Sequence, residues 1–267
     1  MQLSLRRIED QNIYYQESGE DSSIQLVFIP GAFNAEIWKH QINYFSKNYK
    51  TAVFEPLQRR KDYEGVKKAL ESIISQEVMD KVVLVSDITS NSIVQELESH
   101  ENVKATFMTG RYSKPDIPSR TFYKIIWSSL IREPKLLRRT LFSECTRYNV
   151  LKEFSEDVVV PKHDIMKSFL ERHELSRPEK PSATVYSTED RFSSLKSIRN
   201  LQDDHSIRVI ERAGTYSFYE KPEEYNKALN DFLTKVKKSI EKNEVEKARD
   251  KNRSLTEFEK KKVAIKR

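Results

Sequence analysis

Residues 81–97, KVVLVSDITSNSIVQEL, constrain the fold of this chain more than any other stretch. The apolar run at residues 82–85 predicts a short strand that is buried on both of its faces. After a short gap, apolar side chains recur at helical spacing, at Ile93, Val94 and Leu97. The sequence therefore predicts a buried strand that turns sharply into a helix.

Strands and helices alternate through most of the remaining chain. A hairpin is predicted at residues 3–18, and further buried strands are predicted at residues 25–29, 51–54, 103–108, 183–187 and 207–211. Amphipathic helices are predicted between the strands, for example at residues 66–74, where the apolar side chains share one helical face. This order predicts an α/β fold with a mostly parallel sheet of about eight strands, flanked by helices.

The alternation stops once, at residues 111–180. Apolar residues there recur mainly at helical spacing, so we expect a helical insertion. The sequence then predicts three parts: a core formed by residues 1–110 and 181–236, the insertion at 111–180, and a basic C-terminal extension at 237–267.

Composition excludes several kinds of site. The chain has 267 residues, of which 37% are hydrophobic, and this fits a packed globular protein rather than a disordered one. Its single cysteine, Cys145, excludes an internal disulfide and a cysteine-rich zinc site. The histidines show no metal-ligand spacing, and no glycine-rich phosphate loop or dinucleotide motif is present. We therefore predict neither a metal nor a cofactor.

Targeting and membrane signals are not evident in the sequence. The first residues, MQLSLRRIEDQNIYY, lack the apolar core of a signal peptide. No run approaches the ~18 apolar residues of a membrane span. We expect a soluble, cytoplasmic protein with no transmembrane segment.

Positive charge is concentrated at the C-terminal end. The net charge is +6, but residues 235–267 alone hold 13 basic and 6 acidic side chains, a net charge of +7. The preceding residues are therefore close to neutral. The extension is expected either to be a solvated, partly helical segment or to bind an acidic partner, nucleic acid or a membrane surface.

Three segments share a pattern with one known family. The turn at residues 86–90 has small residues at both ends, Pro30 and Gly31 follow the strand at 25–29, and residues 213–224 read AGTYSFYEKPEE. These segments resemble the Gly-x-Ser-x-Gly turn, the His-Gly pair and the Ala-Gly-His segment of the α/β-hydrolase family, AB hydrolase-1 type. The resemblance covers roughly residues 3–236 and implies the α/β-hydrolase fold, with the insertion acting as a lid.

The resemblance also implies a catalytic triad whose nucleophile and base are missing. The nucleophile position holds Ile88, which has no lone pair, and the base position holds Thr215. The acid position is retained as Asp190, in the segment STED at residues 187–190. Because triad residues act as a unit, these losses predict the loss of serine-hydrolase activity. Asp190 is then expected to bond loop amides.

Other groups in the turn offer no complete replacement. Asp87 lies one position too early to be the nucleophile, and no histidine occupies the base position. The hydroxyl groups of Ser86, Thr89 and Ser90 have no neighbouring base. A nucleophile in such a turn has a positive φ, which a β-branched residue resists, so we expect the turn to be relaxed at Ile88.

The surroundings of the site follow from the same resemblance. The donor positions of an oxyanion hole would fall at Ala32, Phe33 and Thr89. A pocket would be lined by aromatic side chains of the core and of the insertion, at Trp38, Tyr216, Phe218, Phe122 and Trp127. Such a lining predicts either a small ligand held by shape and apolar contact, or a cavity that side chains of the insertion have filled, with the function then at the surface or in the C-terminal extension.

Two classes of function remain open. The favoured hypothesis is a pseudoenzyme with a degenerate triad, which acts as a binding or interaction module for a small apolar ligand or a protein partner. The alternative is an atypical hydrolase or lyase that acts on a small apolar ester-like substrate through groups outside the usual triad. The groups within reach of the oxyanion donor positions distinguish the two.

Overall fold

The structure of the protein is a computed structural model. It describes residues 4–8, 11–19, 23–29, 33–54, 63–76, 80–110, 135, 141–157, 178–191, 193 and 205–265. The chain forms two compact units, Met1–Leu229 and Asn230–Arg267, and each is described on its own.

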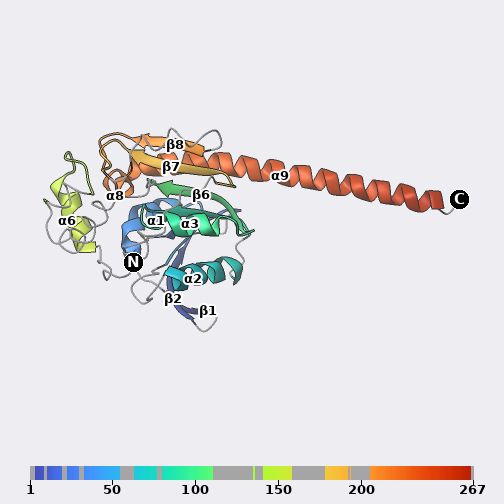
Figure 1. Cartoon of the computed structure of the whole chain (residues 1–267), viewed down its shortest axis with the longest axis horizontal. Coiled ribbons are helices and arrows are strands. Elements are labelled where there is room, and N and C mark those ends of the chain that lie inside the picture. The colour runs from blue at the N-terminus through green and yellow to red at the C-terminus, as the bar shows by residue number, and fades with distance from the viewer. Residues whose placement is uncertain are drawn as a thin grey trace. The chain divides into compact units, whose positions relative to one another are not determined.

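The described strands of the first unit form one sheet, in the order β1-β2-β4-β3-β5-β6-β7-β8 (Figure 1). They are β1 (Ser4–Ile8), β2 (Gln11–Ser18), β3 (Gln25–Ile29), β4 (Lys50–Phe54), β5 (Val82–Ser86), β6 (Val103–Thr109), β7 (Ser182–Ser187) and β8 (His205–Ile210). The pairs β1–β2 and β2–β4 are antiparallel, and the other pairs are parallel. The predicted hairpin and the predicted mostly parallel sheet are confirmed.

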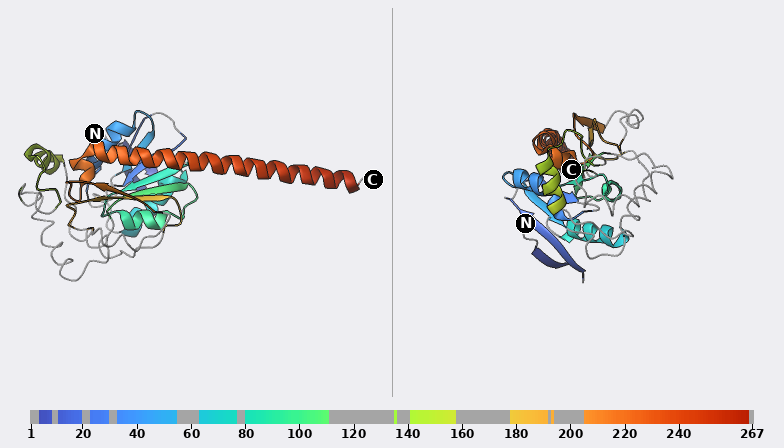
Figure 2. Two further views of the ribbon diagram at one scale, coloured as in Figure 1. Left: turned by 90° about the horizontal axis from the view of Figure 1, so that it is seen from above. Right: turned by 90° about the vertical axis from the view of Figure 1, so that its left-hand side faces the viewer.

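Helices cover both faces of this sheet. The described helices are the 3-10 helix η1 (Ala35–Trp38), α1 (Lys39–Phe45), α2 (Tyr63–Gln76), α3 (Asn91–Leu97), α6 (Tyr148–Asp157), α8 (Ser217–Glu220) and α9 (Pro222–Ile265). Helices α2 and α3 lie on one face of the sheet and α1 lies on the other, as the two orientations in Figure 2 show. The fold class is α/β, as predicted.

The two faces of the sheet bury different side chains. Toward α2 and α3, an aliphatic cluster includes Val27, Ile29, Leu70, Ile74, Leu84, Ile93, Val94 and Met108. On the other face, Trp38 stacks on Phe218 with 4.2 Å between the ring centroids. Phe28 lies 5.4 Å from Trp38 by the same measure. Because side chains alternate along a strand, neighbours such as Val27 and Phe28 serve opposite faces.

The region between β6 and β7 is described in part. Within residues 111–180, the structure describes residues 135, 141–157 and 178–180, which include α6. Leu151 and Phe154 are the side chains that α6 buries. Most of the predicted lid, including Phe122 and Trp127, lies outside the described residues. The predicted domain boundaries therefore stay predictions.

The second unit continues α9, which runs as one helix to Ile265. Among the helices of the described residues, none combines the length and the apolar character that a membrane crossing requires.

Candidate functional site

The turn between β5 and α3 is relaxed, as the sequence predicted. The N–H of Ser90 donates to the carbonyl oxygen of Asp87 at 3.1 Å, so residues 87–90 form an ordinary hydrogen-bonded β-turn. Among the described residues other than glycine, only Arg212 has a positive φ. Ile88 therefore does not adopt the backbone conformation that presents a nucleophile. Its side chain is buried, with 2% of its surface exposed.

Asp87 holds this turn through one of its carboxylate oxygens. Oδ1 accepts hydrogen bonds from the backbone N–H groups of Thr89 and Ser90, each at 2.9 Å. The same oxygen accepts from the hydroxyl groups of both residues, at 2.8 and 2.9 Å. Within the described residues, Oδ2 has no hydrogen-bond partner. Complete burial raises the pKa of Asp87 to about 6, although these hydrogen bonds act in the opposite direction.

The N–H of Thr89 is the donor position that the resemblance assigns to an oxyanion hole. In this structure it donates to Asp87 Oδ1 at 2.9 Å. An oxyanion hole needs N–H groups aimed at the position where the substrate oxygen develops its charge. Here a carboxylate of the protein already occupies that donor. An Asp two residues before Thr89 and three before Ser90 is the pattern of an Asx-turn, so the sequence contained a signal for this contact.

The hydroxyl groups beside Ile88 are also engaged inside the protein. Ser86 Oγ donates to Asn91 Oδ1 at 2.6 Å. Ser90 Oγ lies 2.8 Å from the carbonyl oxygen of Ile29 and 2.9 Å from Asp87 Oδ1, so these two acceptors share its single proton. Asn91 Nδ2 in turn donates to the carbonyl oxygen of Gly110 at 2.6 Å. These bonds tie β5 and α3 to β3 and to the end of β6. The hydroxyl groups thus act as structural groups rather than as activated nucleophiles.

Asp190, at the acid position of the expected triad, is hydrogen-bonded to Thr215, at the base position. Thr215 Oγ1 donates to Asp190 Oδ1 at 2.7 Å, and the N–H of Ser193 donates to the same oxygen at 3.2 Å. Ser193 Oγ donates to Asp190 Oδ2. Asp190 therefore joins the loop after β7 to the loop before α8, which is the structural role expected for it.

Gly110 lies between the nucleophile and acid positions. It has a φ of +63°, and a methyl group on its Cα would lie 3.0 Å from Ile88 Cδ1 and 3.4 Å from Asp190 Oδ2. The structure thus brings Ile88, Asp190 and Thr215 together at the carboxyl ends of β5, β6 and β7. In place of a triad, the Asp190 carboxylate is bonded to the hydroxyl groups of Thr215 and Ser193 and lies near the apolar side chain of Ile88.

Aromatic side chains pack around Phe33, another of the oxyanion donor positions expected from the sequence. Its ring lies 5.3 Å from Tyr216 and 5.8 Å from Phe154 between centroids. Phe142 lies 4.9 Å from Phe154, and Tyr219 lies 5.0 Å from it. Phe142 and Phe154 come from the segment between β6 and β7, so that segment contributes rings to the space beside the site. Ala32 lies outside the described residues.

Of the pocket residues predicted from the sequence, Trp38, Tyr216 and Phe218 are described. All three are buried, and Trp38 and Phe218 stack on each other inside the aromatic core. Tyr216 belongs to the cluster around Phe33. Their predicted role as a ligand-binding surface stays a prediction.

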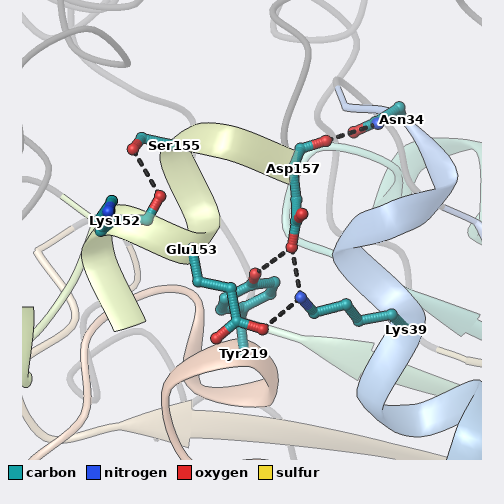
Figure 3. Close-up of polar contacts among 7 residues, drawn as sticks. All are labelled: Asn34, Lys39, Lys152, Glu153, Ser155, Asp157 and Tyr219. Carbon is teal, nitrogen blue, oxygen red and sulfur yellow. Dashed lines mark hydrogen bonds and ion pairs between the residues drawn. The ribbon is translucent and has the colours of Figure 1, made fainter. Parts of the chain in front are cut away.

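A polar cluster fixes α6 beside these rings (Figure 3). Lys39 Nζ forms ion pairs with Glu153 and Asp157 of α6. Tyr219 OH donates to Asp157 Oδ2 at 2.8 Å, and Asn34 Nδ2 donates to the carbonyl oxygen of Asp157 at 2.8 Å. Burial lowers the pKa of Lys39, but the hydrogen bonds to Asp157 and Glu153 outweigh it and the pKa is raised. Sequence reasoning missed this cluster, because its bonds join segments that lie at least 62 residues apart.

A second carboxylate joins the loop of Thr215 to the same segment. Glu220 Oε2 accepts from the N–H of Gly214 at 2.9 Å and from the N–H of Ser143 at 3.2 Å. Thr146 Oγ1 donates to Oε1 of the same carboxylate. Burial raises the pKa of Glu220. The base position is therefore surrounded by contacts that fix backbone, and none of the contacts in the described part of the chain comes from a histidine.

The described histidine side chains do not provide a general base at this site either. His40 packs against Tyr219, with 5.0 Å between the ring centroids. His100 Nδ1 accepts from the N–H of Asn102 at 3.2 Å, so Nε2 carries the proton and donates to Ser75 Oγ at 2.9 Å. That tautomer cannot take a proton from Ser75. Among the described residues, no group of His, Cys, Asp and Glu could hold a metal ion.

No protein-family model matches the sequence, and neither does any curated protein. Solved structures do match the fold. A thermophilic esterase from Thermogutta terrifontis has a TM-score of 0.71 and 14% identity, over 88% of this chain and 99% of that one. A bromoperoxidase from Bacillus anthracis has a TM-score of 0.70 and 13% identity, over 87% and 100%. An enol-lactonase from Burkholderia xenovorans LB400 has a TM-score of 0.70 and 14% identity, over 86% and 100%.

Proposed function

Because the chain has the α/β-hydrolase fold, we propose that it is a pseudoenzyme of that fold, which acts as a binding or interaction module. The observation that carries the proposal is the hydrogen bond from the N–H of Thr89 to Asp87 Oδ1, at 2.9 Å. An anionic oxygen at that donor would have to be displaced before a substrate oxyanion could bind. Each stabilising donor of this kind is typically worth a factor of 10²–10³ in kcat.

The residues at the triad positions support the same proposal. Ile88 supplies no nucleophilic atom. The hydroxyl group of Thr215 donates a hydrogen bond to Asp190, and it is not a base that could accept a proton from a nucleophile. The relaxed turn supports it further, since a strained elbow has no purpose without a nucleophile to present.

The alternative, an atypical hydrolase or lyase acting on a small apolar ester-like substrate, draws on one observation. Asp87 is fully buried, its pKa is raised to about 6, and Oδ2 has no hydrogen-bond partner within the described residues. Carboxylates with such properties occur at catalytic sites. However, the described contacts of Asp87 include no base, and its other oxygen is held by four donors.

Activity measurements on the purified protein test the catalytic half of the proposal. We expect no labelling by a fluorophosphonate probe and no turnover of short-chain nitrophenyl esters above the rate of a mock purification. A wild-type turnover that disappears in Asp87→Asn would overturn the proposal in favour of the alternative. A labelled residue mapped by mass spectrometry would overturn it in favour of a serine-type hydrolase.

The binding half concerns a small apolar ligand or a protein partner at the aromatic cluster of Phe33, Phe142, Phe154, Tyr216 and Tyr219. A thermal-shift screen with fatty acids and small esters tests the first. A ligand present at 100 times its Kd raises the free energy of unfolding by ~2.7 kcal/mol. If no such compound raises the melting temperature, the small-ligand role fails and the partner role is left.

A further inference from the structure

The second unit is rich in basic residues, and several of them fall in a row along its helix. Lys235, Lys238, Lys242 and Arg249 are all exposed. At 3.6 residues per turn, these four positions fall within about 60° of one another around the helix axis. The sequence continues the same spacing at Arg253 and Lys260, and α9 is helical through both positions. We call these six residues the basic stripe.

Three of the six acidic residues among 235–267 fall within about 60° of one edge of the basic stripe, namely Glu246, Asp250 and Glu257. Glu241 and Glu259 fall about 60° from its other edge, and Glu244 falls farther away. Glu246 lies at the border of the basic stripe, and its Oε1 is 3.9 Å from Lys242 Nζ. Both side chains of this pair are largely exposed, at 57% and 76%, so water and salt screen their attraction. The net charge of the basic stripe is therefore available to a partner.

We propose that the basic stripe binds the phosphate backbone of duplex nucleic acid, without regard to sequence. From Lys235 to Lys260 the helix rises about 38 Å at 1.5 Å per residue. A duplex presents a phosphate charge about every 1.7 Å of its axis, so this length matches about 11 base pairs. A row of cations along a straight helix suits such a linear array of anions. The proposal does not depend on the function proposed for the first unit.

The composition of the second unit separates this partner from two others. Binding of single strands normally uses aromatic side chains on which bases stack, but residues 230–267 contain only Phe232 and Phe258. Binding to a membrane surface needs a continuous apolar face. Between residues 241 and 254 only Val245 and Ala248 are apolar, so the helix has no such face there.

Fluorescence anisotropy with the full chain and a labelled 30-base-pair duplex tests the proposal. We expect binding at 50 mM salt that is independent of duplex sequence. With six phosphate contacts, the affinity should fall about 1,000-fold between 50 and 200 mM salt. Absence of binding at 50 mM salt would overturn the proposal. So would tighter binding to phosphatidylserine vesicles than to the duplex, which would assign the stripe to membranes.

A pair of charge-matched variants tests the position of the stripe. The variant Lys235→Glu/Lys242→Glu/Arg249→Glu removes three stripe cations, and we expect it to weaken duplex binding about 100-fold or more. The control Lys237→Glu/Lys247→Glu/Lys251→Glu changes the net charge equally on the opposite side of the helix, and we expect a loss below about 10-fold. Circular dichroism should show equal helix content in both. Equal losses of affinity would show that net charge alone matters and would refute the stripe.

Discussion

At the level of single residues, Asp87 determines what the turn after β5 can do. Its Oδ1 atom binds two backbone N–H groups and two hydroxyl groups of the turn, and one of those N–H groups belongs to the oxyanion position Thr89. Ile88 then needs no strained backbone conformation. The cost of the arrangement is a fully buried carboxyl group with one oxygen that has no partner among the described residues.

The burial of the Asp87 carboxyl group makes the free energy of unfolding depend on pH. The pKa of Asp87 is raised from 3.8 to about 6 in the folded protein, so the folded state holds this proton more tightly than the unfolded chain does. The resulting stabilisation is fully present below pH 3.8 and is lost as the pH rises through about 6. At 1.36 kcal/mol per pKa unit, the loss is about 3 kcal/mol.

Urea unfolding of the wild type and of Asp87→Asn at several pH values between 4 and 7 measures this effect. The difference in the free energy of unfolding between the two proteins should change by about 2.4 kcal/mol over that range, since part of the effect lies below pH 4. Other titrating groups cancel in the difference. A difference that stays constant with pH would show that Asp87 is ionised with an ordinary pKa.

A reconstruction of the triad tests the role of Asp87 at the donor. Ile88→Ser with Thr215→His would place a serine and a histidine beside Asp190, but we expect the double variant to remain almost inactive, since the N–H of Thr89 is still bonded. Adding Asp87→Ala frees that N–H and should raise kcat for a nitrophenyl ester by a factor of about 10²–10³. Equal activity in the double and triple variants would mean that the donor is not limiting.

At the level of elements, α6 is fixed beside the site by both its apolar and its polar side. Phe154 packs against Phe33 and Tyr216, while Glu153 and Asp157 pair with Lys39. The two sets of contacts join α6 to the start of α1 and to α8. Helix α6 therefore acts as a fixed part of the wall around Phe33, in the state that the structure describes.

Lys39→Ala should loosen that attachment. It leaves the carboxylates of Glu153 and Asp157 without their cation, and because both are partly exposed, the free energy of unfolding should fall by only about 1–2 kcal/mol. Hydrogen exchange in α6 should become faster at the same time. The control Lys152→Ala removes an exposed pair with Glu156 of the same helix, 3.7 Å apart, and should cost less than about 0.5 kcal/mol. Equal effects of the two variants would contradict a fixing role for Lys39.

At the level of the whole molecule, the chain contains one sheet-based unit and one helical unit. The first has the α/β-hydrolase fold, and the second has an excess of basic residues. We propose that the two have separate roles, with a degenerate hydrolase site in the first and polyanion binding in the second.

Truncation after residue 236, the boundary that the sequence predicts between the core and the C-terminal extension, tests this division of roles. Removal of residues 237–267 should shift the melting temperature by less than about 4 °C, the change that 1 kcal/mol causes in a domain of this size. Near-ultraviolet circular dichroism should be unchanged, and duplex binding should be lost. A broad, non-cooperative unfolding transition of the shortened chain would contradict the predicted boundary.

Much of the fold and of the site was determined by the sequence alone. The apolar run at 82–85 and the helical spacing that follows it are local signals, and they predicted β5, the sharp turn and α3. Ile88 at the nucleophile position predicted a relaxed turn, because a β-branched side chain resists a positive φ. The predicted positions Ile88, Asp190 and Thr215 lie together because they follow the strands β5, β7 and β8, and the carboxyl ends of parallel strands meet at the same edge of the sheet.

Only the tertiary structure determined which groups share a hydrogen bond or an ion pair across the chain. Lys39 and Asp157 are 118 residues apart, and Glu220 lies 77 residues from Ser143. Periodicity reports which face of an element is buried, but it does not report which element covers that face. The choice depends on how β6, α6 and α8 pack, and packing is the sum of many weak contacts that no local pattern encodes.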